Sequence, residues 1–194
     1  MIDFNNLSAV RYSFANVVYT KKIHEIHKDW ENRKFILYNL VTIIMTGFIL
    51  ASIIIGLVYP KQNWSTTVGI ALVILEVLWL IVTLSFDPKQ RYQAHHNTAN
   101  RLYILREEYI CLMADMINEA HSQKQIAQKR RELLDAGKTI YDEAPSTKNR
   151  AYQMAGKKLK ASKPNKGEDA TLSDDEIDHF LPWMLQYQYL KPYV

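Results

Sequence analysis

The sequence contains a single cysteine, Cys111, which excludes a disulfide within the chain and fits a reducing compartment. It lacks a glycine-rich phosphate loop, a cluster of Cys and His with metal-ligand spacing, and a Ser, His and Asp set that spacing would bring together. Residues 1–34 lack the hydrophobic core of a signal peptide, so a first spanning helix must itself be the insertion signal. We therefore expect no catalytic residues, no metal, no cofactor and no enzymatic activity.

Charged residues are absent from positions 36–58. A helix of that length covers about 35 Å at about 1.5 Å per residue, which is enough to cross a bilayer with some tilt. A second apolar segment, residues 67–86, is just long enough to span and contains one acid, Glu76. Because backbone amides in lipid must pair within their own segment, residues 35–86 are predicted to form an antiparallel helical hairpin. A buried hairpin in a soluble protein is the alternative, but two adjacent segments of this length are rare in soluble domains.

Cations are concentrated outside the two apolar segments. The link between the segments holds Lys61, whereas the outer flanks carry Lys28, Arg33, Lys34, Lys89, Arg91, Arg101 and Arg106. The positive-inside rule then places both termini in the cytosol of a protein that crosses its membrane twice.

The rest of the chain is polar, and the mean hydropathy of the whole is -0.22. Residues 1–34 are predicted to form a cytosolic helical arm that continues into the first span, and residues 87–160 a cytosolic helical region. Residues 161–171 are a polar linker, and residues 172–194 are a C-terminal docking tail. The predicted fold is an all-α membrane protein, with an antiparallel two-helix transmembrane hairpin and a cytosolic helical bundle.

A long helix is predicted to begin at Pro88, with Asp87 as its N-cap. Apolar and aromatic positions recur every three or four residues along it, as in a helix that packs along its whole length on another helix. These candidates for an oligomer seam are Tyr92, His95, Ala99, Leu102, Leu105, Tyr109, Leu112 and Met116. Whether the helix ends within residues 120–125 or continues to Gly137 stays open. Ser146 is predicted to cap a further helix that ends near Lys160.

Polar residues within the apolar segments are candidates for a conduction path. A charged carboxylate at the depth of Glu76 costs at least ~2.5 kcal/mol, so it must be protonated, paired or facing water. It is either a neutral acid bonded to a neighbour or part of a cavity shared in an oligomer. The pore-lining candidates are Glu76, Asn39, Thr42 and Thr46.

Small residues four positions apart allow another helix to approach closely. The pairs are Gly47 with Ala51 and Ser52 with Gly56. They serve packing within the hairpin or, as an alternative, self-assembly.

The histidines also occur in pairs. His24 and His27 lie one turn apart, and we expect a solvated or interfacial face there rather than a metal site. For His95 and His96 a core or interface role is expected.

Charge reverses sign towards the C-terminus. Residues 148–166 hold basic residues and no acid, which is typical of a solvated face or an anionic-lipid contact, and direct nucleic-acid binding is not expected. Ser173 and Glu176 then form a predicted capping box. The exposed-looking aromatics Trp183, Tyr187 and Tyr189 predict docking, either onto the chain's own bundle or onto a partner.

Several short motifs follow the hairpin. They are Asp87, Pro88, Arg91, His95, Ala99, Leu105 and Glu108, then Ala144 and Pro145 before Tyr152 and Ala155, and finally Leu172, Ser173, Glu176, Ile177, Leu181 and Pro182. With the hairpin, they make the chain resemble the SLATT family, two-helix membrane effectors of bacterial conflict systems such as CBASS. The tail is more similar to the subgroup linked to defence reverse transcriptases.

The resemblance implies a bacterial inner-membrane protein that stays inert until a sensor fires, then oligomerises and permeabilises the membrane in abortive infection. It also implies a cytosolic sensor or signal-generating partner, either a reverse transcriptase or a nucleotide synthase. Two other hypotheses remain: a membrane-anchored scaffold that recruits such a partner, and a small ion-coupled transporter that uses Glu76 as a proton site.

Overall fold

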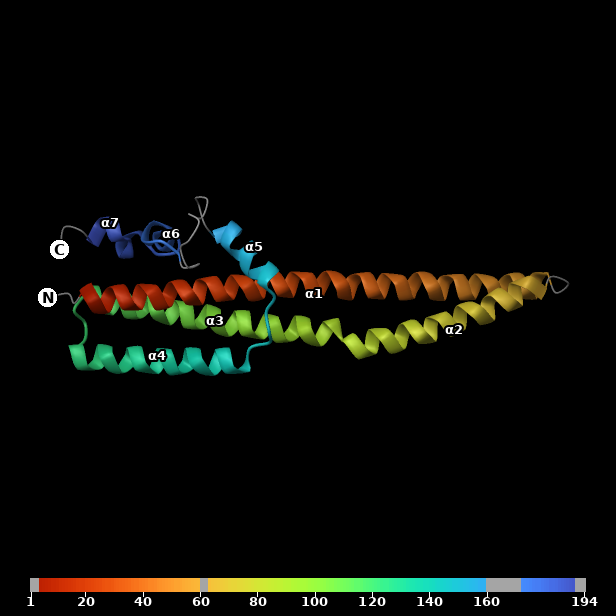
Figure 1. The fold of residues 1–194 in the computed structure, drawn as a ribbon, viewed down its shortest axis with the longest axis horizontal. Helices are drawn as coiled ribbons and strands as arrows, with labels where there is room; N and C mark the ends of the chain where they lie inside the picture. Colours follow the sequence, from red (N-terminus) through yellow and green to blue (C-terminus); the bar gives the residue numbers. More distant parts are fainter. Residues whose placement is uncertain (1–3, 60–62, 160–171, 191–194) are drawn as a thin grey trace. The chain divides into compact units, whose positions relative to one another are not determined.

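The computed structural model describes residues 4–59, 63–159 and 172–190. Helix α1 (Phe4–Val58) runs without a break for 55 residues, so the predicted arm and the first apolar segment form one helix (Figure 1). Neither Pro nor Gly interrupts the sequence between Phe4 and Thr46, which leaves every backbone N–H of that stretch free to join the helix.

Most of the remaining described residues are also helical, and the described residues contain no strand. The elements after α1 are α2 (Asn63–Phe86), α3 (Pro88–Ile117), α4 (Gln123–Glu143), α5 (Asn149–Leu159), α6 (Asp174–Asp178), the 3-10 turn η1 (Trp183–Leu185) and α7 (Tyr187–Leu190). The predicted all-α class is confirmed. Helix α2 begins at Asn63 rather than Thr67, because the polar residues of the predicted link already form its first turn.

Asp87 is the single residue between α2 and α3. It has a positive φ of 29°, a conformation that Asp tolerates better than most residues. Its carboxylate oxygen Oδ1 accepts the backbone N–H of Gln90 at 3.0 Å, and Pro88 occupies the first helical position, where no N–H is needed. Asp87 therefore ends α2 and caps α3, as predicted, and α3 runs on in the direction of α2 (Figure 1).

The connection before α4 overlaps the range predicted from the sequence, whereas the connection after α4 differs from the prediction. Helix α3 ends at Ile117, and Ser122 with Gln125 forms a capping box that starts α4, so the long helix does break before Gly137. The prediction that Ser146 caps the next helix is wrong. Residue 144 is extended ahead of Pro145, as expected before a proline, and α5 begins only at Asn149.

The chain forms two compact units: a bundle unit of residues 1–28 and 94–194, and a hairpin unit of residues 29–93. In the bundle unit the first part of α1 lies beside α3 and α4 (Figure 1). The side chains of Ser13 and Tyr109 share a hydrogen bond, as do those of Thr20 and Tyr141. The largest fully buried side chains of this core are Tyr109, Phe14, Leu102, Met113 and Leu133.

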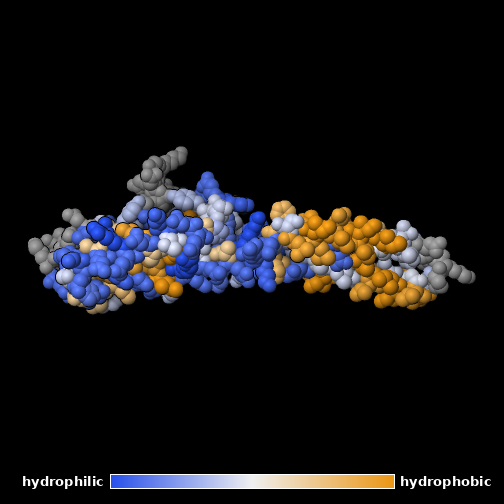
Figure 2. All heavy atoms as spheres, turned by 90° about the horizontal axis from the view of Figure 1, so that it is seen from below, coloured by the Kyte–Doolittle hydropathy of each residue, from blue (hydrophilic) through white to orange (hydrophobic). Residues whose placement is uncertain are grey.

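The hairpin unit has the opposite arrangement of polarity. The second part of α1 and all of α2 carry most of their Ile, Leu, Val and Phe side chains on the outside, and these atoms form the orange surface in Figure 2. Only 6% of the most apolar window of each long helix is buried. A helical hairpin in the core of a soluble protein would be mostly buried, so this surface fits contact with lipid.

Candidate functional site

A polar cluster lies within the hairpin unit, between α1 and α2. Thr46 Oγ1 lies 2.5 Å from Glu76 Oε1, and the indole Nε1 of Trp79 donates to Thr42 Oγ1 at 3.2 Å. The Trp79 ring also meets the Tyr38 ring edge to face, with centroids 5.2 Å apart. Two side-chain contacts one helical turn apart thus join α1 to α2. Thr46 of α1 contacts Glu76 of α2, and Thr42 of α1 contacts Trp79 of α2.

The hydrogen bonds of this cluster limit how its protons can be arranged. The Thr42 hydroxyl donates to the Tyr38 carbonyl at 3.0 Å and accepts from Trp79, so both of its roles are filled. The Thr46 hydroxyl has one proton but two acceptors within reach, the Thr42 carbonyl at 3.0 Å and Glu76 Oε1. A carboxyl group that carried its own proton could donate to Thr46 Oγ1, and the hydroxyl proton could then serve the Thr42 carbonyl.

The structure thus brings together three of the four pore-lining candidates, Thr42, Thr46 and Glu76. Asn39 is exposed on α1, one turn before Thr42. Sequence reasoning missed Trp79, although its position three residues after Glu76 on the same helix face could have indicated it.

The two pairs of small residues have different surroundings. Nothing lies within 4 Å of the Cβ position of Gly47, and Ala51 is exposed. Ser52 is buried against Gly69, where an added Cβ would collide with Ser52 Oγ, and a Cβ on Gly56 would lie 3.3 Å from Ser65 Oγ. Ser52 and Gly56 therefore pack the hairpin, together with Gly69, which the sequence analysis did not single out.

An apolar groove continues from this contact. It has a volume of about 500 Å³, and its lining includes Ile49, Ser52 and Gly56 of α1 and Gly69, Ile70 and Val73 of α2. Small side chains allow the two helices to approach closely beside this groove.

The predicted seam of α3 packs within the chain. Seven of its eight residues are buried in the core, with exposed fractions from 0% for Leu102 to 5% for Met116, and Tyr92 is half-buried. The Cδ2 atom of Leu105 lies 3.4 Å from the Cβ position of Gly137 on α4. The spacing therefore predicted helix packing correctly, but the partner helices are α1 and α4 of the same chain. A second copy could use this seam only if the bundle opened.

The C-terminal tail docks onto the chain's own α1 through Arg11. This guanidinium is 3% exposed and donates to the Leu185 carbonyl at 3.0 Å and to the Asp178 carboxylate at 2.7 Å. Its Nη2 also lies 3.5 Å from a carboxylate oxygen of Asp174. Sequence reasoning missed Arg11, because nothing on its own helix distinguishes it from a solvated arginine.

The docked tail leaves aromatic side chains on its outer side. Trp183, Tyr187 and Tyr189 are exposed, and the rings of Trp183 and Tyr189 meet edge to face with centroids 5.5 Å apart. Leu185 turns inward and is buried. The tail therefore packs on the bundle through Leu185, while Trp183 and Tyr189 lie on its exposed side; the Tyr187 ring lies 6.0 Å from the Arg11 guanidinium.

Three histidines form a buried cluster in the bundle unit. Nδ1 of His24 and Nδ1 of His95 are 2.9 Å apart, so one ring donates and the other accepts. The His27 ring stacks on His95 with centroids 4.6 Å apart and an interplanar angle of 10°. The prediction of a solvated or interfacial face for His24 and His27 is wrong, because their exposed fractions are 2% and 3%. His95 lies in the core as predicted, whereas His96 is half-buried.

Burial has a direct electrostatic consequence for this cluster. Loss of water around His24, and secondarily the proximity of His27, lowers the pKa of His24 from 6.5 to about 4. A His27 Nε2 that accepts the backbone N–H of Lys148 at 2.9 Å is unprotonated at that nitrogen. The cluster is therefore built for neutral imidazoles. Within the described residues, no group of three or more His, Cys, Asp or Glu has the geometry to hold a metal ion.

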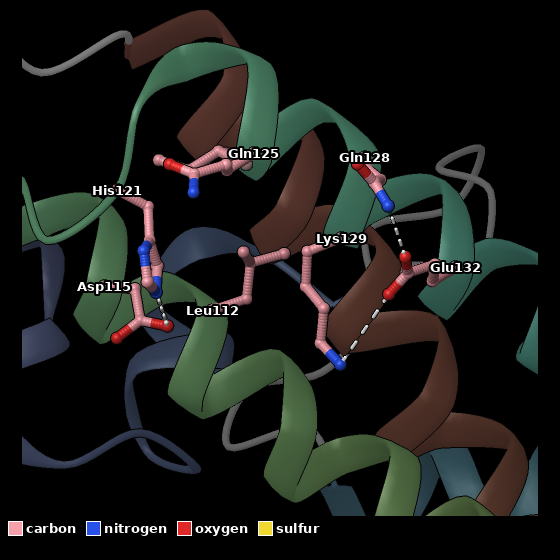
Figure 3. A pocket seen from close by; sticks show the side chains of 8 residues that line it. Leu112, Asp115, His121, Gln125, Gln128, Lys129 and Glu132 are labelled. Carbon is pink, nitrogen blue, oxygen red and sulfur yellow. Dashed lines mark hydrogen bonds and ion pairs between the residues drawn. The ribbon is translucent and has the colours of Figure 1, made fainter.

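A polar pocket of about 380 Å³ lies where α3 ends and α4 begins, as Figure 3 shows. His121 Nε2 lies 3.7 Å from a carboxylate oxygen of Asp115, and Lys129 Nζ lies 4.0 Å from a carboxylate oxygen of Glu132. The pocket is open to solvent, and its lining includes Asp115, Lys129 and Glu132, so side chains of both signs border it.

These features define a class of protein: an α-helical membrane protein with two spans and a separate helical bundle. The chain belongs to the SMODS and SLOG-associating 2TM effector domain family, family 4, whose family model matches residues 7–176. The match covers both apolar segments and most of the bundle unit, and it confirms the resemblance to the SLATT family. No curated protein and no solved structure matches the chain.

Proposed function

We propose that this protein is an effector of a bacterial antiphage defence system that oligomerises and, when triggered, forms a pore or disrupts the inner membrane, giving abortive infection. Its family consists of two-span membrane effectors, which supports a role in defence. The observation that carries the finer proposal is the cluster of Glu76, Thr46 and Thr42 within a hairpin whose outer surface is apolar.

A purely structural hairpin does not need such a cluster. An acid in the middle of a spanning segment costs several kcal/mol, and intramembrane acids are functional by default. Apolar packing through Ser52, Gly56 and Gly69 already joins the two helices at another level. Keeping Glu76 at its position is therefore explained better by a role in ion passage than by hairpin stability.

Two helices cannot enclose an aqueous path, so conduction requires several copies of the hairpin. In a ring of copies the Glu76 carboxylates would form a ring of acids, which favours cations. In this proposal the resting chain is the form described above, with Glu76 bonded to Thr46, and assembly moves the carboxylate towards the path.

The surrounding arrangement follows from the distribution of charge. Both termini lie on the cytosolic side of the inner membrane, since cations flank the outer ends of the spans. A cytosolic sensor or signal-generating partner, either a reverse transcriptase or a nucleotide synthase, then has access to the bundle and tail.

The exposed aromatics of the tail favour a second candidate, a membrane-anchored scaffold for that partner. Trp183 is 61% exposed and Tyr189 is 47% exposed. Aromatic side chains of this size are usually buried, either in the protein core or in an interface with another protein. In a scaffold, the hairpin would serve only as an anchor.

Membrane potential distinguishes the two candidates. Bacteria expressing the chain at increasing levels, alone and then with its genomic neighbour and a phage trigger, are followed with a voltage-sensitive dye. The effector predicts depolarisation that needs both trigger and hairpin. A membrane that stays polarised, while fractionation shows the protein inserted, would contradict the effector and support the scaffold.

A further inference from the structure

We infer that His27 is a proton-operated latch: in its neutral form it binds the start of α5 to α1, and a fall in cytosolic pH releases that end of α5. The latch consists of His27, its stacked neighbour His95, and the backbone N–H of Lys148. This inference concerns the bundle unit alone and does not require the hairpin to conduct ions.

A hydrogen bond between His27 and Lys148 joins α1 to the start of α5. The N–H of Lys148 donates to His27 Nε2 at 2.9 Å across 121 positions of the sequence. Lys148 is the residue whose carbonyl accepts the first helical N–H of α5, from Ala151 at 2.9 Å. His27 therefore fixes the residue from which α5 starts, in the place where sequence reasoning expected Ser146 to cap the helix.

A proton on Nε2 of His27 removes the bond to Lys148. A neutral imidazole has one N–H and one acceptor nitrogen, and the acceptor of His27 is Nε2. A proton taken up from water adds there, so the lone pair that binds the Lys148 N–H is consumed and two N–H groups face each other. The bond is lost, and a charged ring remains in a site that is 3% exposed.

The surroundings of His27 also disfavour a positive charge on its ring. His95 covers one face of the His27 ring at 4.6 Å, and His95 is bonded to His24. Protonation of His27 would therefore place a cation against two further imidazoles, one of them directly stacked. The pKa of His24 is already lowered by burial and by His27, which shows how this site acts on an imidazole.

The other charged groups on the packed elements are engaged elsewhere. On α1, Glu25 pairs with Lys21 and Lys22, and Glu31, one turn beyond His27, pairs with Lys34. On α3, His96 bonds Asn100, and on α5 the titratable groups near the start are Lys148, Arg150 and Tyr152. Lys28 directly follows His27. Asp29 lies two residues after His27 on α1, so charges of both signs flank the ring in the sequence.

Helix α5 has its own attachment, which limits the release to the segment ahead of it. The Tyr19 hydroxyl donates to the Tyr152 carbonyl at 2.9 Å, and burial, with a smaller effect of Tyr152, raises the pKa of Tyr19 to about 12. This bond does not change in mildly acidic solution. Ala151 and Ala155 are fully buried against the bundle. Acid therefore frees the segment of residues 144–148, while the second half of α5 stays in place.

The test measures the distance between α1 and the segment ahead of α5 in the full chain, reconstituted in lipid nanodiscs. Cys111 is replaced by Ser, and spin labels are attached at Ser8 and Thr147, both exposed. Distance distributions are recorded at about pH 7.5 and about pH 3.5, because burial and the neighbouring imidazoles disfavour the charged ring and the lower pH must lie well below the ordinary histidine pKa of about 6.5. The latch predicts one narrow distance at the higher pH and a broad, longer distribution at the lower pH.

His27→Gln is the decisive variant, because the amide oxygen can accept the Lys148 N–H but does not titrate in this range. It should keep the narrow distance at both pH values, whereas the control His179→Gln, at an exposed histidine of the tail, should respond as the wild type does. A wild-type distance that does not change between the two pH values overturns the latch. So does a His27→Gln response equal to that of the wild type.

A second measurement covers the case in which His27→Gln does not fold. In the wild type labelled with ¹⁵N-histidine, the ring of His27 should gain its proton with the same midpoint as the distance change. A distance change that occurs while the His27 ring stays neutral overturns the inference.

Discussion

Arg11 and Asp178 form an ion pair of 2.7 Å although 167 positions separate them in the sequence. The pair joins α1, which continues into the first span, to the short helix α6 of the tail. Because the Leu185 carbonyl accepts a further bond from the same guanidinium, a single side chain holds both ends of the α6–η1 segment.

Arg11→Ala should therefore release the tail from the bundle. Removing one partner of a buried charge pair costs about 3 kcal/mol, because Asp178 and the Leu185 carbonyl lose their donor. The α6 amides should then exchange with deuterium about 100-fold faster, since each 1.4 kcal/mol is tenfold. Arg131→Ala, at an exposed arginine of α4, is the matched control. Exchange in α6 that stays as slow as in the wild type would show that Arg11 does not hold the tail.

The pH dependence of stability should reflect His24. Its pKa is about 4 in the folded chain and about 6.5 when unfolded, so the unfolded chain binds more protons between these values. Stability therefore rises with pH across this window and falls as the pH drops from about 6.5 towards 4, by ~3 kcal/mol in total.

This slope is measured by denaturant unfolding of the full chain in detergent at several pH values, with the helical signal as readout. His24→Gln should lose most of the slope, whereas His121→Gln, at an exposed position, should keep it. A wild-type stability that is constant from about pH 6.5 to about pH 4 would contradict a buried neutral His24.

Local sequence patterns predicted the elements well. The two apolar segments, the Asp87 cap and the Ser173–Glu176 capping box all depend on residues close together in the sequence, and the structure shows each of them. The periodicity of α3 predicted that its seam is packed, but a period cannot name the partner helix.

The interactions that the sequence did not reveal join distant residues. His24 and His95 are 71 positions apart, and the partners of Arg11 are more than 160 positions away. A histidine or arginine whose partner lies on another element has the same local pattern as a solvated one. The burial of His24, His27 and Arg11 could therefore come only from the tertiary structure.

The two glycines of the hairpin should respond differently to the same substitution. Gly69→Ala places a methyl group where Ser52 Oγ lies, so the serine hydroxyl must rotate or the helices must separate, and overpacking of this kind costs about 1–3 kcal/mol. Gly47→Ala meets nothing within 4 Å in the single chain. The unfolding temperature of the purified protein in detergent should thus be lowered by Gly69→Ala and not by Gly47→Ala.

The same pair of variants also decides between the two uses of the small residues. If Gly47→Ala abolishes oligomers in chemical cross-linking while thermal stability is unchanged, the outer face of α1 is a self-assembly surface. Equal thermal stability of the two variants would show that the Ser52 hydroxyl rotates away and that its contact with Gly69 does not limit the approach of the helices.

Glu76→Gln should change the ion preference of the assembled hairpins without changing their assembly. The amide of Gln can still bond Thr46, so the cluster is kept while the charge is removed from the position. Because a ring of carboxylates favours cations, the ratio of cation to anion permeability should fall several-fold. The measurement is the reversal potential in planar bilayers under a salt gradient. Glu107→Gln, on α3 outside the apolar segments, is the control and should leave the ratio unchanged. If Glu76→Gln conducts with the wild-type preference, the carboxylate lies outside the conduction path, and its bond to Thr46 serves only to hold the two helices together.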